Sequence, residues 1–246
     1  MCPSGSRRTA RSSSHSFRSN RERHRPARGR GHRERGRTGD GDRPRPRTAP
    51  PAMATDRVLV LLHGRGDSPA GILRLVDDIY VRGVRYLAPA AAGRVWYPGE
   101  LTEPVTQRRR AYLDSAFGQV ERALAEARSL GVDPEDVVLA GFSQGASVAT
   151  EFATRRPRRY GGLVALAGGL LGPTDELGPR AGSLDGTPAV CGVGGDDPHV
   201  SVEHAEATAA ALSQMDADAS AETYQGVGHA IGDGGVETLR RLTRRD

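Results

Sequence analysis

VVLAGFSQGASVA, residues 137–149, decides the fold of this chain. An apolar run from Val137 to Ala140 leads into Gly141-Phe142-Ser143-Gln144-Gly145, and a segment of helical character follows. Strand, sharp turn and helix in this order lift a serine hydroxyl clear of a sheet, and the flanking glycines allow the tight bend. N–H groups at the start of the helix point to where negative charge would develop on a substrate. The stretch therefore predicts a nucleophilic serine, Ser143, at the end of a buried strand.

Two later strands end in loops that carry the partners such a serine needs. Residues 187–193 are typical of a buried strand and run into Asp196 and Asp197, and the last short strand, 221–224, is followed by His229. Serine, then acid, then histidine is the chain order of the catalytic triad in α/β-hydrolases. The pattern predicts a serine hydrolase, and the residues alone leave both aspartates open as the acid. The alternative for either carboxylate is a helix N-cap, because a helix follows Pro198.

Strands and helices alternate through the rest of the core. The expected strands are 58–62, 84–88, 137–140, 160–166, 188–193 and 221–224, and the expected helices are 70–81, 107–130, 144–155, 204–215 and 236–244. This alternation predicts an α/β fold, with a mostly parallel sheet that has helices on both faces. Ligands should bind at the carboxyl ends of the strands.

Four motifs together resemble the phospholipase/carboxylesterase family, which includes the acyl-protein thioesterases. They are His63-Gly64-Arg65-Gly66-Asp67, Gly141-Phe142-Ser143-Gln144-Gly145, Asp197-Pro198-His199-Val200 and Tyr224-Gln225-Gly226-Val227-Gly228-His229. The resemblance covers essentially all of 56–243. It implies a compact α/β-hydrolase core without a large cap domain, which cleaves ester or thioester bonds without a cofactor. The family has an aspartate directly before a proline, and this selects Asp197 as the acid.

Each member of the implied site has an expected role. Ser143 would attack the acyl carbonyl, His229 would take and return the proton, and Asp197 would hold the imidazole. The backbone N–H groups of Arg65 and Gln144 would form the oxyanion hole.

Residues 93–104 are expected to form a wall of the substrate pocket, with Trp96 and Tyr97 as large, semi-polar lining residues. The alternative is a packed surface loop. His63 could be a second base, but the family pattern favours a role in supporting the oxyanion loop, and we also count it among the substrate-binding residues. His199 is expected to be a pocket-wall or capping residue.

Two basic features suggest anionic substrates. Arg65 stands where the familiar thioesterases carry a small apolar residue, and its side chain predicts a preference for a carboxylate or phosphate near the scissile bond. The run Arg108-Arg109-Arg110 could also attract anions, although a solvated helix face is the commoner explanation.

Composition divides the chain near residue 52. Residues 1–52 carry 15 arginines against four acidic residues, with Phe17 as the only aromatic side chain. They cannot bury enough apolar surface to offset chain entropy, so we predict a disordered segment followed by a catalytic domain over 53–246. Met53 stands just before the first strand, and we expect it to be the native start. From another functional class, the arginine-rich segment could bind nucleic acid, but it lacks the interleaved aromatic residues of a stacking surface.

Other patterns limit the partners and the compartment. The sequence has no apolar run long enough to span a membrane and no apolar centre of a secretion signal in its basic segment. Cys2 and Cys191 are too few for a disulfide framework, and no histidines or cysteines have metal-ligand spacing. We expect a cytoplasmic carboxylesterase or thioesterase with no metal, cofactor or integral membrane contact, and a small-molecule substrate. A lysophospholipase or a hydrolase of a small metabolic ester is the alternative within enzymes, and dimers are common for this resemblance.

Overall fold

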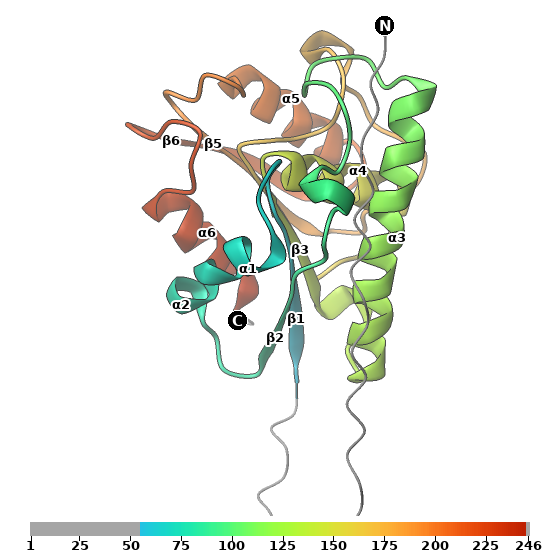
Figure 1. Ribbon diagram of the computed structural model, residues 1–246, viewed down its shortest axis with the longest axis vertical. Coiled ribbons are helices and arrows are strands. Elements are labelled where there is room, and N and C mark those ends of the chain that lie inside the picture. The colour runs from blue at the N-terminus through green and yellow to red at the C-terminus, as the bar shows by residue number, and fades with distance from the viewer. Residues whose placement is uncertain (1–54, 245–246) are drawn as a thin grey trace, which may run out of the picture. The chain divides into compact units, whose positions relative to one another are not determined.

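The computed structural model describes residues 55–244 (Figure 1). The segment 1–52, its predicted disorder and the nucleic-acid hypothesis built on it lie outside the described residues. Within residues 55–244, six parallel strands form one sheet in the order β2-β1-β3-β4-β5-β6. The strands are β1 (Arg57–Leu62), β2 (Val84–Leu87), β3 (Val137–Phe142), β4 (Gly162–Leu166), β5 (Pro188–Gly194) and β6 (Asp218–Tyr224).

Helices cover both faces of this sheet (Figure 1). The helices are α1 (Pro69–Ile72), α2 (Val76–Ile79), α3 (Gln107–Ser129), α4 (Gln144–Arg155), α5 (Val202–Ser213) and α6 (Asp233–Thr243). One face carries α3, α4 and α5, and the other carries α1, α2 and α6. The α/β-hydrolase fold predicted from the sequence is confirmed.

The central strand β1 shows why its residues form a buried strand. Val58, Val60 and Leu62 pack towards α3 and α4, whereas Leu59 and Leu61 pack on the opposite face. All five are at most 1% exposed. Burying such a side chain stabilises the fold by about 1.5–3 kcal/mol. A continuous apolar run, rather than an alternating one, is what a strand covered on both faces requires.

Some elements differ in extent from the sequence prediction. The expected helix 70–81 is three short helical segments, α1, a 3-10 turn at Leu73–Leu75, and α2, and it ends at Ile79. Its apolar stripe still packs against the sheet, through Ile72 and Ile79. Strand β4 begins two residues later than expected and β6 three residues earlier. The polar sequence of β6 hid its length, because this strand lies at the edge of the sheet and is largely exposed.

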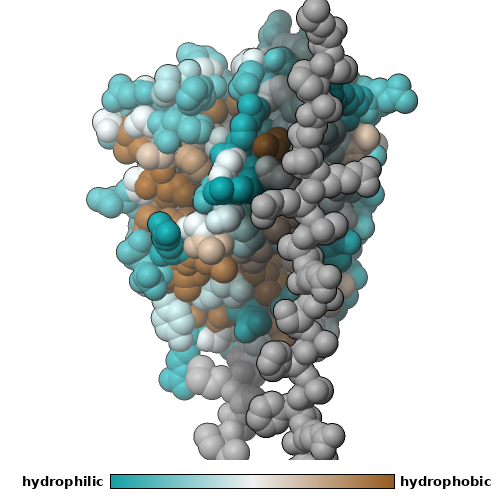
Figure 2. Space-filling view, in the orientation of Figure 1, coloured by the Kyte–Doolittle hydropathy of each residue, from teal (hydrophilic) through white to brown (hydrophobic). Residues whose placement is uncertain are grey.

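Figure 2 shows that apolar side chains gather over the layer formed by α1, α2 and α6. Several of these hydrophobic residues are only partly buried, namely Leu73, Leu75, Val76, Ile231 and Val236. Within residues 55–244, no helix is both long and apolar enough to cross a membrane.

The strand order places a ligand site. The chain runs from β1 outwards to β2, and then returns to the other side of β1 to form β3. The carboxyl ends of β1 and β3 therefore flank the point where the order reverses, and open α/β sheets bind ligands there. Residues 63–67 follow β1, and Ser143 follows β3.

Candidate active site

Ser143 occupies a sharp turn between β3 and α4. Its backbone lies at φ 54° and ψ −120°, a region that non-glycine residues rarely adopt. Strain of this kind costs on the order of 1–3 kcal/mol and persists only where the surroundings hold it. The Ser143 N–H donates to the carbonyl oxygen of Leu166 at 2.8 Å, which fixes the turn to β4.

The two glycines of the motif are required by close backbone contacts. A Cβ at Gly141 would lie 2.2 Å from the carbonyl carbon of Gly145, and a Cβ at Gly145 would lie 2.0 Å from the Leu62 oxygen. Helix α4 therefore begins directly against β1 and β3. This close approach aims the serine side chain away from the sheet.

We predict that Gly145→Ala lowers the free energy of unfolding by about 3 kcal/mol, the upper end of the usual cost of overpacking, because backbone must move to admit the methyl group. Chemical denaturation of the variant measures this. The matched control is Gly118→Ala in α3, where nothing lies within 4 Å of the added Cβ. That change should stabilise the protein by about 0.5–1 kcal/mol, since alanine favours a helix over glycine. Equal stabilities for the two variants would contradict the close packing at Gly145.

A series of hydrogen bonds joins Ser143, His229 and Asp197. Nε2 of His229 lies 3.0 Å from Oγ of Ser143, and Nδ1 of His229 lies 2.8 Å from Oδ2 of Asp197. The Asp197 side chain is fully buried, and its Oδ1 accepts the N–H groups of His199 at 2.8 Å and Val200 at 3.1 Å. Asp196, the other aspartate left open by the sequence, is exposed. An imidazole held in this way can take a proton from the serine hydroxyl.

The acid and histidine loops are tied together by their backbones. Gly195 donates its N–H to the Tyr224 carbonyl at 2.8 Å, and Asp196 donates to the Val227 carbonyl at 3.0 Å. The Phe142 ring also packs on His229, with ring centroids 5.0 Å apart. These contacts fix the imidazole with respect to the serine.

The loop after β1 carries Arg65, whose N–H group the sequence predicts as the second oxyanion donor. Within residues 55–244, the backbone N–H groups of Arg65 and Gln144 donate no hydrogen bond to another residue. Segment 91–100 braces this loop: the Gly66 N–H donates to the Arg94 carbonyl, and the Trp96 indole donates to the His63 carbonyl at 2.7 Å. A braced loop with free N–H groups suits the binding of a developing oxyanion.

His63 and Trp96 do not line the cleft beside Ser143, contrary to the expectation that they bind substrate. His63 is 1% exposed, its Nδ1 lies 2.7 Å from the Gly64 oxygen, and its Nε2 accepts the Ala91 N–H at 3.2 Å. Both ring nitrogens are therefore engaged in supporting the loop. Trp96 is 2% exposed and packs on His63, with centroids 4.9 Å apart. A tryptophan can support a loop, with its indole N–H bonded to a buried acceptor, or it can line a pocket. The sequence alone does not distinguish these two roles for Trp96.

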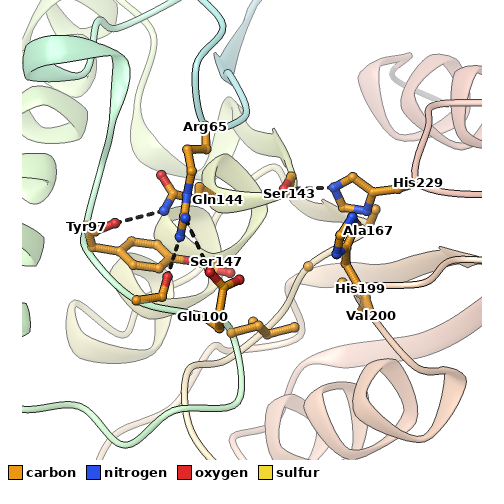
Figure 3. Close-up of a pocket in the computed structure, with 13 residues that line it drawn as sticks. Arg65, Tyr97, Glu100, Ser143, Gln144, Ser147, Ala167, His199, Val200 and His229 are labelled. Carbon is orange, nitrogen blue, oxygen red and sulfur yellow. Dashed lines mark hydrogen bonds and ion pairs between the residues drawn. The ribbon is translucent and has the colours of Figure 1, made fainter.

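The cleft itself has a volume of about 320 Å³. Figure 3 shows Ser143 between His229 on one side and Arg65, Tyr97, Ser147 and Glu100 on the other. Its lining comprises Arg65, Tyr97, Gly99, Glu100, Leu101, Ser143, Gln144, Ser147, Ala167, Gly168, His199, Val200 and His229. Tyr97 and His199 thus line it as expected, and the His199 ring packs edge-on against His229 with centroids 4.9 Å apart.

Sequence reasoning did not single out two polar residues of this cleft, Ser147 and Glu100, although Glu100 belongs to the expected pocket wall 93–104. Ser147 lies one helical turn after Ser143, so the spacing of the two serines was the available signal. Glu100 forms an ion pair with Arg65 at 3.3 Å, and Arg65 also donates to the Gly99 carbonyl. The Arg65 guanidinium is therefore already engaged, and an anionic substrate would have to compete with Glu100 for it.

The arginine run in α3 is not a uniformly solvated face. Arg108 and Arg110 are exposed, but Arg109 is 2% exposed. Its guanidinium lies 4.8 Å from the centroid of the Tyr97 ring and donates to the carbonyls of Glu103, at 2.6 Å, and Glu100. Arg109 holds the cleft wall from behind.

The described residues contain no group of three His, Cys, Asp or Glu side chains that could hold a metal ion.

Comparisons with known proteins fit this geometry. A family model described as phospholipase/carboxylesterase matches residues 44–244. The chain is 28% identical to an esterase of Escherichia coli, YpfH, over 74% of this chain and 79% of that protein. It is 28% identical to acyl-protein thioesterase 1 of Yarrowia lipolytica over 48% of this chain and 60% of that protein. A phospholipase/carboxylesterase structure from Dyadobacter fermentans superposes with a TM-score of 0.71 at 33% identity, over 80% of this chain and 94% of that one.

Proposed function

The chain belongs to the phospholipase/carboxylesterase family of serine hydrolases, and we propose that it cleaves small carboxylic esters or thioesters with Ser143, His229 and Asp197 as its catalytic triad. The observation that carries the assignment is the hydrogen-bonded series of these three side chains at the edge of the cleft. The names of the similar proteins, an esterase and an acyl-protein thioesterase, support the cleavage of ester or thioester bonds.

The first half of the reaction forms an acyl-serine. Oγ of Ser143 attacks the acyl carbonyl carbon while Nε2 of His229 takes the hydroxyl proton. Asp197 keeps Nδ1 of the imidazole protonated and stabilises the cation that forms. The backbone N–H groups of Gln144 and Arg65 bind the oxyanion, and the loss of one such donor costs about 3 kcal/mol of barrier in comparable sites.

The second half releases the acid. His229 has by then given its proton to the alcohol or thiol, whose bond to the acyl carbon breaks as the acyl-serine forms, and a water molecule enters beside the imidazole. His229 takes a proton from this water as its oxygen attacks the acyl carbon. The bond between this carbon and Oγ of Ser143 then breaks, and Oγ recovers its proton from His229. No redox step occurs, so the chemistry needs only the residues named.

The cleft supports small substrates. A volume of about 320 Å³ lies at the lower end of the range for small-molecule sites, roughly 300–1,000 Å³. The cleft therefore suits short acyl groups better than long fatty chains.

The test is hydrolysis of p-nitrophenyl esters from acetate to decanoate by the full chain, together with labelling by a serine-directed fluorophosphonate. We expect turnover that is fastest for short acyl groups, and a single phosphonate adduct that peptide mass mapping places on Ser143. A folded protein that neither hydrolyses these esters nor takes up the label would contradict the proposal. An adduct on another serine would contradict the assignment of the nucleophile.

A further inference from the structure

Ser147 lines the cleft with a buried hydroxyl for which the described residues offer, beside the nearby Tyr97 phenol, no hydrogen-bond partner. It is 1% exposed, and among the described residues its Oγ has no hydrogen-bond partner of normal geometry. An unpaired buried hydroxyl is unfavourable, and native structures contain few of them.

The same helix shows that another arrangement was open to this serine. Thr150 bonds back to the Ala146 carbonyl at 3.1 Å, and Thr154 bonds back to the Thr150 carbonyl at 2.9 Å. Such bonding to the residue four positions earlier is the usual way to satisfy a hydroxyl within a helix. Ser147 does not make this bond.

The Tyr97 phenol is the polar neighbour of Ser147. Figure 3 shows the Tyr97 ring extending towards Ser147. Burial raises the pKa of Tyr97 to about 12, and the nearby Ser147 hydroxyl opposes this shift. The phenol is therefore neutral at physiological pH, and like the serine it can both donate and accept a hydrogen bond. Arg109 holds the ring in place from behind.

The position of these hydroxyls relative to Ser143 indicates which part of a substrate they meet. His229 must protonate the leaving group, so the leaving group departs on the His229 side. The acyl group then extends to the other side of Ser143, where Tyr97 and Ser147 lie (Figure 3). The Ser147 N–H donates to the Ser143 carbonyl at 3.2 Å, so the two serines lie one helical turn apart along the chain, a span of a few carbon atoms.

We propose that Ser147 and Tyr97 form a polar acyl subsite that selects short acyl groups carrying a neutral hydroxyl or keto oxygen on the second or third carbon beyond the ester carbonyl. A neutral group is favoured over a carboxylate because Glu100 also lines the cleft and pairs with Arg65. This inference rests on the proposed function, since it takes Ser143 as the nucleophile.

The experiment compares p-nitrophenyl 3-hydroxybutanoate with p-nitrophenyl butanoate, which differ by one hydroxyl, using the full chain. The parent should prefer the hydroxylated ester by about tenfold in kcat/KM, which is what one hydrogen bond supplies. In Ser147→Ala the preference should reverse: kcat/KM should fall about tenfold for 3-hydroxybutanoate and rise for butanoate. Tyr97→Phe should shift the ratio in the same direction.

The matched control is Thr150→Val, a change of a buried hydroxyl on the same helix that does not line the cleft. It should leave the ratio of the two esters as in the parent. If Ser147 had only a structural role, Ser147→Ala would lower kcat/KM equally for both esters and would lower the melting temperature. This outcome would overturn the subsite. A parent that hydrolyses both esters at equal kcat/KM would overturn the subsite alone. Hydrolysis of neither would overturn the proposed function with it.

Discussion

Replacing Ser143 by alanine is expected to lower kcat for ester hydrolysis by roughly a millionfold, the scale of losing the nucleophile from a complete triad. The variant keeps the cleft and the backbone N–H groups of Arg65 and Gln144, but it lacks the Ser143 oxygen that would form the acyl intermediate. Residual turnover should stay about 10³–10⁴-fold above the uncatalysed rate, because oxyanion stabilisation and binding alone supply that much. The measurement is single-turnover hydrolysis of p-nitrophenyl butanoate at high protein concentration.

Two controls keep this result interpretable. Ser115→Ala changes an exposed serine of α3 outside the cleft and should leave kcat within about twofold of the parent. The melting temperature of Ser143→Ala should match that of the parent, since alanine adopts the strained backbone at residue 143 no less readily than serine. A variant that kept a tenth of the parent's kcat would mean that Ser143 is not the nucleophile.

The sequence was most informative where one residue type is forced by the backbone. Gly141 and Gly145 mark the turn because any Cβ at either position would meet backbone atoms. Runs such as Val58–Leu62 mark strands because both faces of a parallel sheet are covered. Any chain that forms such a turn or such a strand needs these residue types. The fold class and the family could therefore be predicted from the sequence.

The residues that line the cleft were harder to predict, because side chains of the same type occur both at its surface and in the packed layer behind it. Trp96 and Tyr97 are neighbours with similar chemistry, yet Tyr97 lines the cleft and Trp96 lies behind it, bonded to the His63 carbonyl. Arg109 looks like its exposed neighbours in sequence, and only the placement of the Tyr97 ring and of two carbonyl oxygens explains its burial. Burial of a polar group depends on distant partners, which a local pattern does not contain.

The prediction that Arg65 attracts anions shows the same limit for charge. A lone guanidinium beside a nucleophile would favour an anionic substrate, but Glu100, 35 positions later, pairs with it. Exposed ion pairs of this kind contribute only about 0–1 kcal/mol. The larger consequence of the Arg65–Glu100 pair is that the rim of the cleft carries both signs of charge, which favours a polar, uncharged acyl group.

Asp197→Asn is expected to lower kcat by about 10⁴-fold, because the amide would enforce the wrong tautomer of His229. Oδ1 of Asp197 accepts two backbone N–H groups, from His199 and Val200, so the amide oxygen of asparagine would take this place. The amide NH₂ would then face Nδ1 of His229, which becomes an acceptor. Nε2 would carry the proton and could no longer take one from Ser143.

Asp196→Asn is the matched control, one residue away with the same change in charge. Asp196 is exposed, so kcat should stay within about twofold of the parent. The comparison separates a specific hydrogen bond from a general loss of negative charge near the imidazole, which both variants share. Equal losses in the two variants would mean that the carboxylate acts through its charge alone, and a larger loss in Asp196→Asn would reverse the assignment of the acid. Asp197 is buried and both of its oxygens are hydrogen-bonded, so we expect the large loss in Asp197→Asn alone.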